Sequence, residues 1–95
     1  MSLFVEWDTG KAERNLDKHG VSFSEAATVL EDQHSITLPD PDHSMEEERL
    51  LLLGRSSSGR MLIVAITERG TTVRIISARP MTPRERRTYE HETGR

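Results

Sequence analysis

The 95-residue sequence predicts a single α+β domain, residues 1–95, with two N-terminal helices and a short C-terminal helix on a mainly antiparallel sheet. Two observations lead to this fold class. Helix signals, either periodic apolar residues or N-cap sequences, occur in the first third of the chain and near its end. Between them, short apolar runs follow one another across turn residues, as is typical of strands joined in hairpins. We therefore expect the helices to lie on one side of the sheet.

The first third of the chain predicts a strand and then a helix. Residues 3–7 form a short apolar run that only Glu6 interrupts. Asp8 is placed to cap a helix, and Gly20 lies where that helix would end in a left-handed residue. His19, in the last turn, suits the negative end of the helix dipole, so we favour a structural role for it over general-base catalysis.

Further capping signals and apolar runs predict the remaining elements. Ser22 and Glu25 have capping-box spacing at the start of a second helix. Thr82 and Glu85 have the same spacing at the start of a third helix, which runs to about residue 92. Strands are expected over residues 35–38, 50–53, 61–67 and 71–79, with a polar loop over residues 40–48.

The hairpin formed by the last two strands carries arginines where a sheet needs none. A two-residue Arg69-Gly70 turn is expected, with Arg74 opposite Ala65. Alternate apolar residues then form a core face, and the other face, which carries Thr67 and Arg74, can stay partly open. The core residues expected here are Leu62, Val64, Ile66, Val73 and Ile75.

The charge of the chain is divided unevenly. Residues 1–48 carry 3 basic and 12 acidic side chains, whereas residues 49–95 carry 10 Arg, no Lys and 4 Glu. These balances of −9 and +6 add to the net charge of −3. Such asymmetry between halves indicates a polyanionic ligand or a charged partner.

Composition also excludes several classes of protein. The chain has no cysteine, and His43 stands among carboxylates without fixed ligand spacing, so we expect no metal site and no cofactor. No apolar run is long enough to span a membrane, and no signal peptide is evident. We therefore expect a soluble cytoplasmic protein with no membrane contact.

Several short motifs together resemble one known family. They are Phe4-Val5-Glu6-Trp7-Asp8, Lys18-His19-Gly20-Val21-Ser22-Phe23, Glu48-Arg49, Gly54-Arg55-Ser56 and Ile75-Ile76-Ser77-Ala78-Arg79. In this order they resemble the BrnT family of toxins from bacterial type II toxin–antitoxin systems. The resemblance implies a RelE-like fold, a ribonuclease that inhibits translation, and neutralisation by a DNA-binding antitoxin of the ribbon–helix–helix type. Operator DNA would then be contacted only through the antitoxin. The chain departs from the family pattern at Ile66, where His or Tyr is often found, and at Pro80, where relatives often have a basic residue.

Four residues are candidates for catalysis. RNA cleavage without a metal needs a base for the 2′-hydroxyl and cations for the charge on the phosphorane. Arg74 is the first candidate cation because a planar guanidinium on a rigid strand suits phosphate; the alternative is an exposed residue whose stem covers apolar surface. Glu68 could be the base or lie in a solvated turn. Lys11 could bind an anion at the start of the first helix or be an ordinary surface lysine. Arg79 could assist Arg74 or pair with a glutamate of the last helix.

Three further residues are candidates for binding RNA. Trp7 could stack on a base, although a lone tryptophan is more often a core anchor. Arg69 could clamp a phosphate or lie in a solvated turn. Tyr89 could stack or donate a proton, or pack the last helix.

We therefore predict a toxin that acts as a metal-independent endoribonuclease on RNA and is neutralised by a ribbon–helix–helix antitoxin. The alternative, which Ile66 keeps open, is a catalytically inactive toxin-like module that binds an antitoxin and contributes to operon repression. A stand-alone nucleic-acid-binding domain is disfavoured because the pI is near 5.8. A homodimer is left open.

Overall fold

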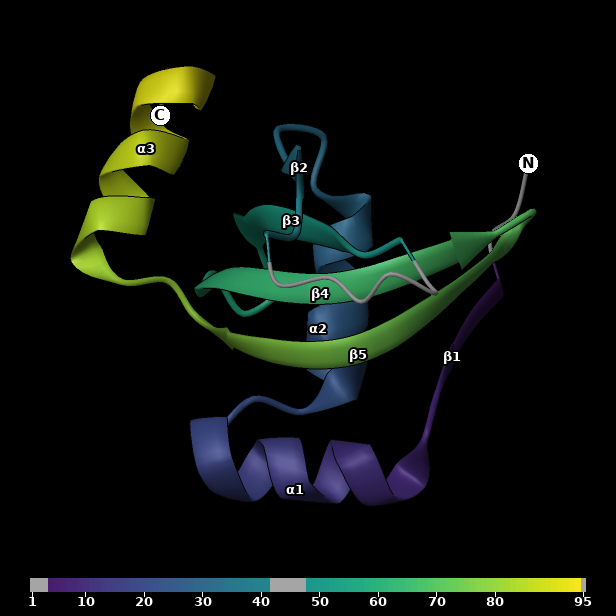
Figure 1. Cartoon of the computed structure of the whole chain (residues 1–95). Helices are drawn as coiled ribbons and strands as arrows, with labels where there is room; N and C mark the ends of the chain where they lie inside the picture. Colours follow the sequence, from purple (N-terminus) through teal and green to yellow (C-terminus); the bar gives the residue numbers. More distant parts are fainter. Residues whose placement is uncertain (1–3, 42–47, 95) are drawn as a thin grey trace.

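The computed structural model describes residues 4–41 and 48–94, which form a five-stranded sheet and three α-helices. In chain order the elements are β1 (Phe4–Trp7), α1 (Thr9–His19), α2 (Phe23–Thr28), the 3₁₀ turn η1 (Val29–Glu31), β2 (Ile36–Pro39), β3 (Leu50–Arg55), β4 (Met61–Arg69), β5 (Thr72–Pro80) and α3 (Pro83–Thr93). This order confirms the predicted α+β class (Figure 1). The expected polar loop around His43 lies mostly outside the described residues. Within those residues, no helix has the length and apolar character needed to cross a membrane.

The strands are ordered β1-β5-β4-β3-β2 across the sheet. The strands β2 to β5 pair antiparallel with their neighbours, as hairpin connections require. The N-terminal strand is the exception, because β1 pairs parallel with β5. The sheet is thus mainly antiparallel, and its one parallel contact brings the start of the chain beside the arginine-bearing strand.

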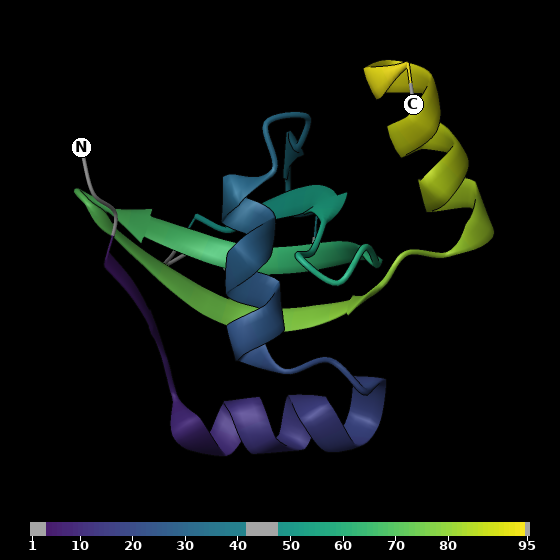
Figure 2. The same ribbon diagram turned by 180° about the vertical axis from the view of Figure 1, so that it is seen from behind.

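The main core lies on the face covered by the first two helices. In Figure 2, α2 crosses this face of the sheet and α1 runs along β5. Buried side chains of α2 and its flanking turns pack against β3, β4 and β5. The predicted core residues are all buried, namely Leu62, Val64, Ile66, Val73 and Ile75.

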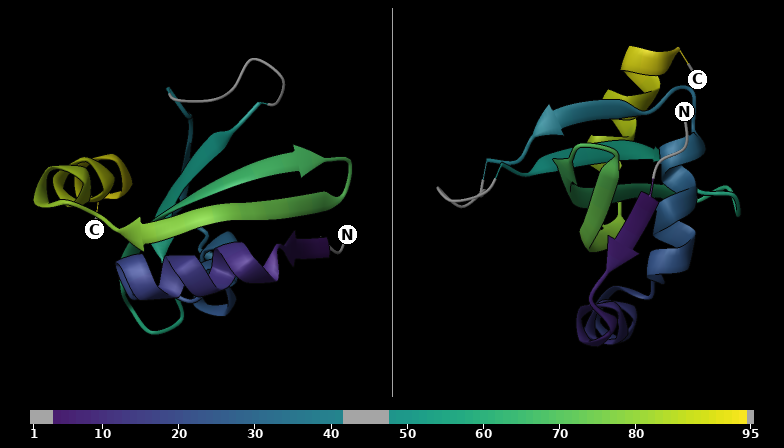
Figure 3. Two further views of the ribbon diagram at one scale, coloured as in Figure 1. Left: turned by 60° about the horizontal axis from the view of Figure 1, so that its bottom comes forward. Right: turned by 90° about the vertical axis from the view of Figure 1, so that its right-hand side faces the viewer.

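The third helix is not on the side that the sequence predicted. In Figure 3, α3 stands at the end of the sheet, beyond the last residue of β5. Its buried Tyr89 packs with Leu53 and Ile63, which belong to the face opposite α2. Only Met81 and Thr82 separate β5 from α3, and so short a connection cannot carry the helix back over the covered face.

Side-chain caps set the helix limits where the sequence placed them. Asp8 accepts a hydrogen bond of 2.9 Å from the Lys11 N–H at the start of α1. Gly20 ends that helix with a φ of 69°, in the left-handed region that favours glycine. Ser22 caps α2, and Thr82 caps α3 in a complete capping box. These local signals fix the two ends of the first helix and the start of each of the others.

The β4–β5 hairpin differs from the prediction in its register. The turn is Gly70-Thr71, one residue later than expected, so Arg74 lies opposite Thr67 and not opposite Ala65. Gly70 has a φ of 61°, which explains why the turn forms around it. Each residue of β4 near the turn pairs with a β5 residue two positions later than predicted. The side chains still lie on their predicted faces, because side chains alternate along a strand with a period of two.

A bulge in β5 decides which arginines share a face. The pairing shifts between Ala65 and Ile66 of β4, and Ile76 is the extra residue on β5. Arg74 and Arg79 are five positions apart, so a regular strand would direct them to opposite faces. The bulge places both on the face opposite α2.

Candidate functional site

A row of polar side chains crosses the sheet on the face opposite α2. Glu6 of β1 pairs with Arg74 of β5, and Arg74 pairs with Thr67 of β4. Arg49 immediately precedes β3, and extending the β3–β4 ladder by one residue brings it beside Thr67. Four residues from four separate segments therefore lie in one line across a rigid sheet.

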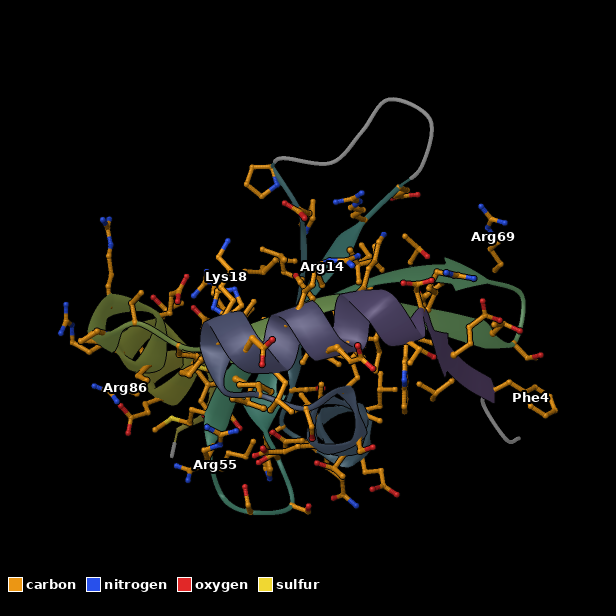
Figure 4. All side chains as sticks on the ribbon, turned by 90° about the horizontal axis from the view of Figure 1, so that it is seen from below. Phe4, Arg14, Lys18, Arg55, Arg69 and Arg86 are labelled. Carbon is orange, nitrogen blue, oxygen red and sulfur yellow. The ribbon has the colours of Figure 1, made fainter. Side chains whose placement is uncertain are left out.

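This row forms part of a pocket of about 470 Å³. Two more cations border it, Lys11 from the first turn of α1 and Arg69 from the end of β4. Figure 4 shows Arg69 of β4 at the hairpin end of the sheet, well away from Arg55, the last residue of β3. Thr67 is 3 % exposed and lies among these charged groups. Among the described residues that line the pocket, four cations face one carboxylate, which suits a polyanion.

An ion pair holds Arg74 at the centre of the row. Its Nε and Nη2 atoms lie 3.0 and 2.7 Å from Oε2 of Glu6. Both side chains are 48 % exposed, so water screens the pair and its contribution to stability is small. A guanidinium has five N–H donors, so Arg74 can hold Glu6 and an anion at the same time.

A buried asparagine fixes the position of Lys11 relative to Arg74. The Nδ2 group of Asn15 donates to the carbonyls of Val21 and Ala78 at 2.9 and 2.8 Å, and its Oδ1 accepts from the Ala78 N–H at 3.0 Å. β1 pairs with β5 only as far as residue 75, so the edge of β5 beyond it needs other partners. Asn15 supplies them, and it thereby docks α1 against the strand that carries Arg74.

Arg79 shares the face of Arg74 but is held in an ion pair. Its Nη1 and Nη2 atoms donate to the two carboxylate oxygens of Glu85 at 2.7 and 2.9 Å. These hydrogen bonds from Arg79 lower the pKa of Glu85 to about 2. The same pairing raises the pKa of Arg79. The predicted alternative, a pair with a glutamate of the last helix, thus describes the contact that Arg79 makes.

A second charged cluster ties the β3–β4 hairpin to α2. Oε2 of Glu25 accepts hydrogen bonds from Nε of Arg60 at 3.0 Å and from the hydroxyls of Ser56 and Ser58 at 2.7 and 2.6 Å. The hydrogen bond from Arg60 is the largest cause that lowers the pKa of Glu25 to about 2, and the two serines add to it. The cluster lies at the other end of β3 from the pocket.

Besides Arg79, three more of the predicted site residues do not line the pocket. Glu68 pairs with Val73 of the core face, so it is directed away from Arg74. Trp7 lies on the helix-covered side, where its ring packs edge-to-face on Phe23 with centroids 6.1 Å apart. Tyr89 is fully buried, and its hydroxyl donates to Asp32 at 2.8 Å, so it has no surface on which a base could stack. The structural alternative stated for Tyr89 describes its position, whereas Trp7 is 36 % exposed and packs at the edge of the core rather than inside it.

Lys11, Arg69 and Arg74 are the predicted residues that the fold brings together. Glu6 and Arg49 also line the pocket, and the sequence did not suggest a role for either. Glu6 had one signal, since it is the polar residue in an otherwise apolar strand. The sequence indicated a role for Arg49 less clearly, because basic residues are common before a strand. Nowhere in the described parts of the chain do three or more His, Cys, Asp or Glu side chains form a group that could hold a metal ion.

Comparison with known proteins gives the family of this chain. The model of the family described as "Ribonuclease toxin, BrnT, of type II toxin-antitoxin system" matches residues 7–85. The crystal structure of the Brucella abortus ribonuclease toxin BrnT is similar, with a TM-score of 0.66 and 21 % identity over 85 % of this chain and 99 % of that chain. At this identity the likeness concerns the fold alone. No curated protein matches the chain. Since the family model covers most of its length, the chain belongs to the BrnT family of ribonuclease toxins of type II toxin–antitoxin systems.

Proposed function

We propose that this chain is a metal-independent endoribonuclease that cleaves RNA in the pocket around Arg74 and thereby inhibits translation. The observation that carries the proposal is that the described residues lining the pocket bring four cations, three of them on or beside the sheet strands and one on α1, around one carboxylate. Preorganised cations supply the charge stabilisation that phosphoryl transfer needs, and a metal ion is one of several ways to provide it.

Each group in the pocket has a chemical role in this proposal. Glu6, in place of the predicted Glu68, accepts the proton of the ribose 2′-hydroxyl. The 2′-oxygen then bonds to phosphorus while the bond to the 5′-oxygen breaks, which leaves a 2′,3′-cyclic phosphate and a 5′-hydroxyl. Arg74 and Lys11 stabilise the dianionic phosphorane, and the Lys11 ammonium can protonate the leaving oxygen. Arg69, at the rim, binds a neighbouring phosphate.

The type II system implies an antitoxin, and we propose that it is a ribbon–helix–helix protein that covers this pocket. Four cations in an open pocket attract an acidic or amphipathic segment for the same reason that they attract RNA. Binding there would exclude the substrate, and the bound antitoxin would make the contacts to operator DNA. Because we propose that the protein acts on RNA and on translation, we also propose that it acts in the cytoplasm.

The alternative of an inactive module rested on Ile66, where relatives often have His or Tyr. Ile66 is 3 % exposed and belongs to the core under the helices. It therefore lies on the face opposite the pocket, and a larger side chain at this position would contact the core and not the substrate. This position is thus weak support for a loss of activity.

A direct test is to express the chain without its antitoxin and to assay the purified protein on RNA in EDTA. We expect growth arrest, reduced protein synthesis, and RNA fragments that end in a 2′,3′-cyclic phosphate. An Arg74→Ala variant purified in parallel controls for a contaminating nuclease. Cleavage that EDTA abolishes and Mg²⁺ or Mn²⁺ restores would overturn metal independence. If the RNA stays intact under all conditions while the antitoxin still binds, the inactive module is correct.

A further inference from the structure

We propose that Arg49 is a substrate-contacting residue of this site, whose Nε–H group donates to a phosphate of the bound RNA. The inference rests on the proposed function, which it extends by one residue. Arg49 lies outside the catalytic hairpin in sequence, 25 positions before Arg74. Its assignment comes from its place in the cross-strand row and from an unpaired donor.

The unpaired donor is the first observation. Nε of Arg49 is buried and has no hydrogen-bond partner in the described structure. A buried N–H group without a partner lowers the stability of the fold by about 1–3 kcal/mol, and by more when it belongs to a charged group. Such groups are therefore rare in folded proteins and need a physical explanation. This Nε is closed to solvent in the present conformation, so a phosphate in the pocket accepts its hydrogen bond only once the Arg49 side chain turns toward the ligand, and that bond removes the penalty.

An unpaired donor alone does not identify a binding site, and Arg55 shows why. Its Nε is also buried without a partner among the described residues. Arg55 lies at the other end of β3, in a shallow pocket that it shares with Glu31 and Asp32, and an anion would be repelled there. Arg49 instead shares its pocket with three other cations. The unpaired Nε of Arg49 therefore lies among cations, whereas the unpaired Nε of Arg55 lies near carboxylates.

The geometry of the row also fits a phosphate. Arg49 and Arg74 flank Thr67 on either side, so their backbones are two strand spacings apart, roughly 10 Å. Arginine side chains reaching over a small residue from both sides can engage one phosphate or two adjacent ones. Arg74 is already oriented by Glu6, whereas no carboxylate among the described lining residues pairs with Arg49.

The test is the salt dependence of binding to a 2′-O-methyl RNA oligonucleotide, which lacks the attacking hydroxyl and cannot be cleaved. Arg49→Met keeps the aliphatic stem but removes the charge and the Nε–H group. We expect it to weaken binding on the order of 10- to 100-fold. The slope of log K against log salt should become less steep by about 0.7, the value for one phosphate contact on a single strand. Arg49→Lys should keep the slope and recover part of the affinity. Arg55→Met is the matched control and should change neither quantity.

The outcomes separate this inference from the proposed function. If the wild-type chain binds the oligonucleotide but does not cut natural RNA, the proposed function fails while the Arg49 contact is still decided by the slope. If the wild type cuts RNA and Arg49→Met binds and cuts as Arg55→Met does, the inference about Arg49 is wrong. If Arg49→Met no longer melts cooperatively, Arg49→Lys becomes the deciding variant. If Arg49→Lys is folded and binds the oligonucleotide as tightly as the wild type, the Nε contact is wrong. A wild-type chain that does not bind the oligonucleotide overturns both.

Discussion

Arg74 should contribute far more to RNA cleavage than to folding, because its ion pair is exposed whereas its guanidinium lies in the pocket where we propose that the phosphate reacts. Arg74→Ala removes an ion pair with Glu6 in which both side chains are 48 % exposed. Exposed pairs of this kind contribute about 0.2–1 kcal/mol. In a domain of this size, 1 kcal/mol corresponds to a shift in Tm of about 4–8 °C, so the melting temperature should fall by no more than this.

The expected effect on catalysis is larger. Loss of one preorganised donor to a developing oxyanion lowers kcat on the order of 10²–10³-fold, or about 3–4 kcal/mol. Arg74→Lys should restore part of the rate, because the charge returns without the planar pair of donors. Glu6→Gln keeps a hydrogen-bond acceptor for Arg74 but removes the proposed base, so it should lower the rate.

The assay is single-turnover cleavage of a labelled RNA at saturating enzyme, with a thermal melt of each variant. Saturation separates the chemical step from binding, and the melt shows that each variant is folded at the assay temperature. The reasoning is refuted if Arg74→Ala cleaves at the wild-type rate, because Arg74 would then be an ordinary surface residue. It is also refuted if Arg74→Ala loses cleavage activity and thermal stability together, since the loss of activity would then follow from the loss of the fold.

Three other perturbations test separate parts of the structure. Asn15→Ala removes three hydrogen bonds to buried backbone groups and should lower the free energy of unfolding in urea by about 3 kcal/mol, at about 1 kcal/mol a bond; an unchanged midpoint would mean that α1 is docked by other contacts. The pKa values of Glu25 and Glu85 lie at about 2, below the usual 4.5, so these pairs stabilise the fold above pH 4.5 and this stabilisation should disappear between pH 4.5 and 2. In acid titrations followed by circular dichroism, the double variant with Gln at both positions should lose less stability across that range than the wild type. The antitoxin should compete with uncleavable RNA for the pocket, and a stable ternary complex would show that it inhibits from another surface.

The start of each α-helix and the end of the first helix could be predicted because each is set by residues that lie close together in the sequence, whereas strands β3 and β4 end two residues later than predicted. Asp8 reaches the Lys11 N–H three residues away, and Gly20 ends the same helix by its own backbone conformation. The alternation of apolar residues likewise identified the core face of β4 and β5. None of these inferences requires knowledge of which strands are neighbours.

The site could be predicted only in part because it depends on contacts between distant segments. Glu6 and Arg74 are 68 positions apart and meet through the parallel pairing of β1 with β5, which hairpin connectivity does not suggest. Glu68 was a candidate base at the hairpin, with a solvated turn as its alternative, and its partner across the hairpin is Val73 of the core face. The bulge at Ile76 had no sequence signal, although it decides that Arg79 faces the same side as Arg74.

The net charge of −3 is a poor guide to RNA binding in this chain, because it counts acidic groups that have partners of their own and do not line the pocket. Asp8 caps α1, Glu25 holds Arg60, Asp32 accepts from the Tyr89 hydroxyl, and Glu85 holds Arg79. At physiological salt, charges more than about 8 Å apart are largely screened from one another where solvent lies between them. Among the described residues that line the pocket there are four cations and one carboxylate, namely Lys11, Arg49, Arg69, Arg74 and Glu6, so these lining groups carry a balance of +3. If RNA binds there, as we propose, this local charge explains how a protein with a pI near 5.8 holds a polyanion, and the affinity should fall steeply as salt is raised.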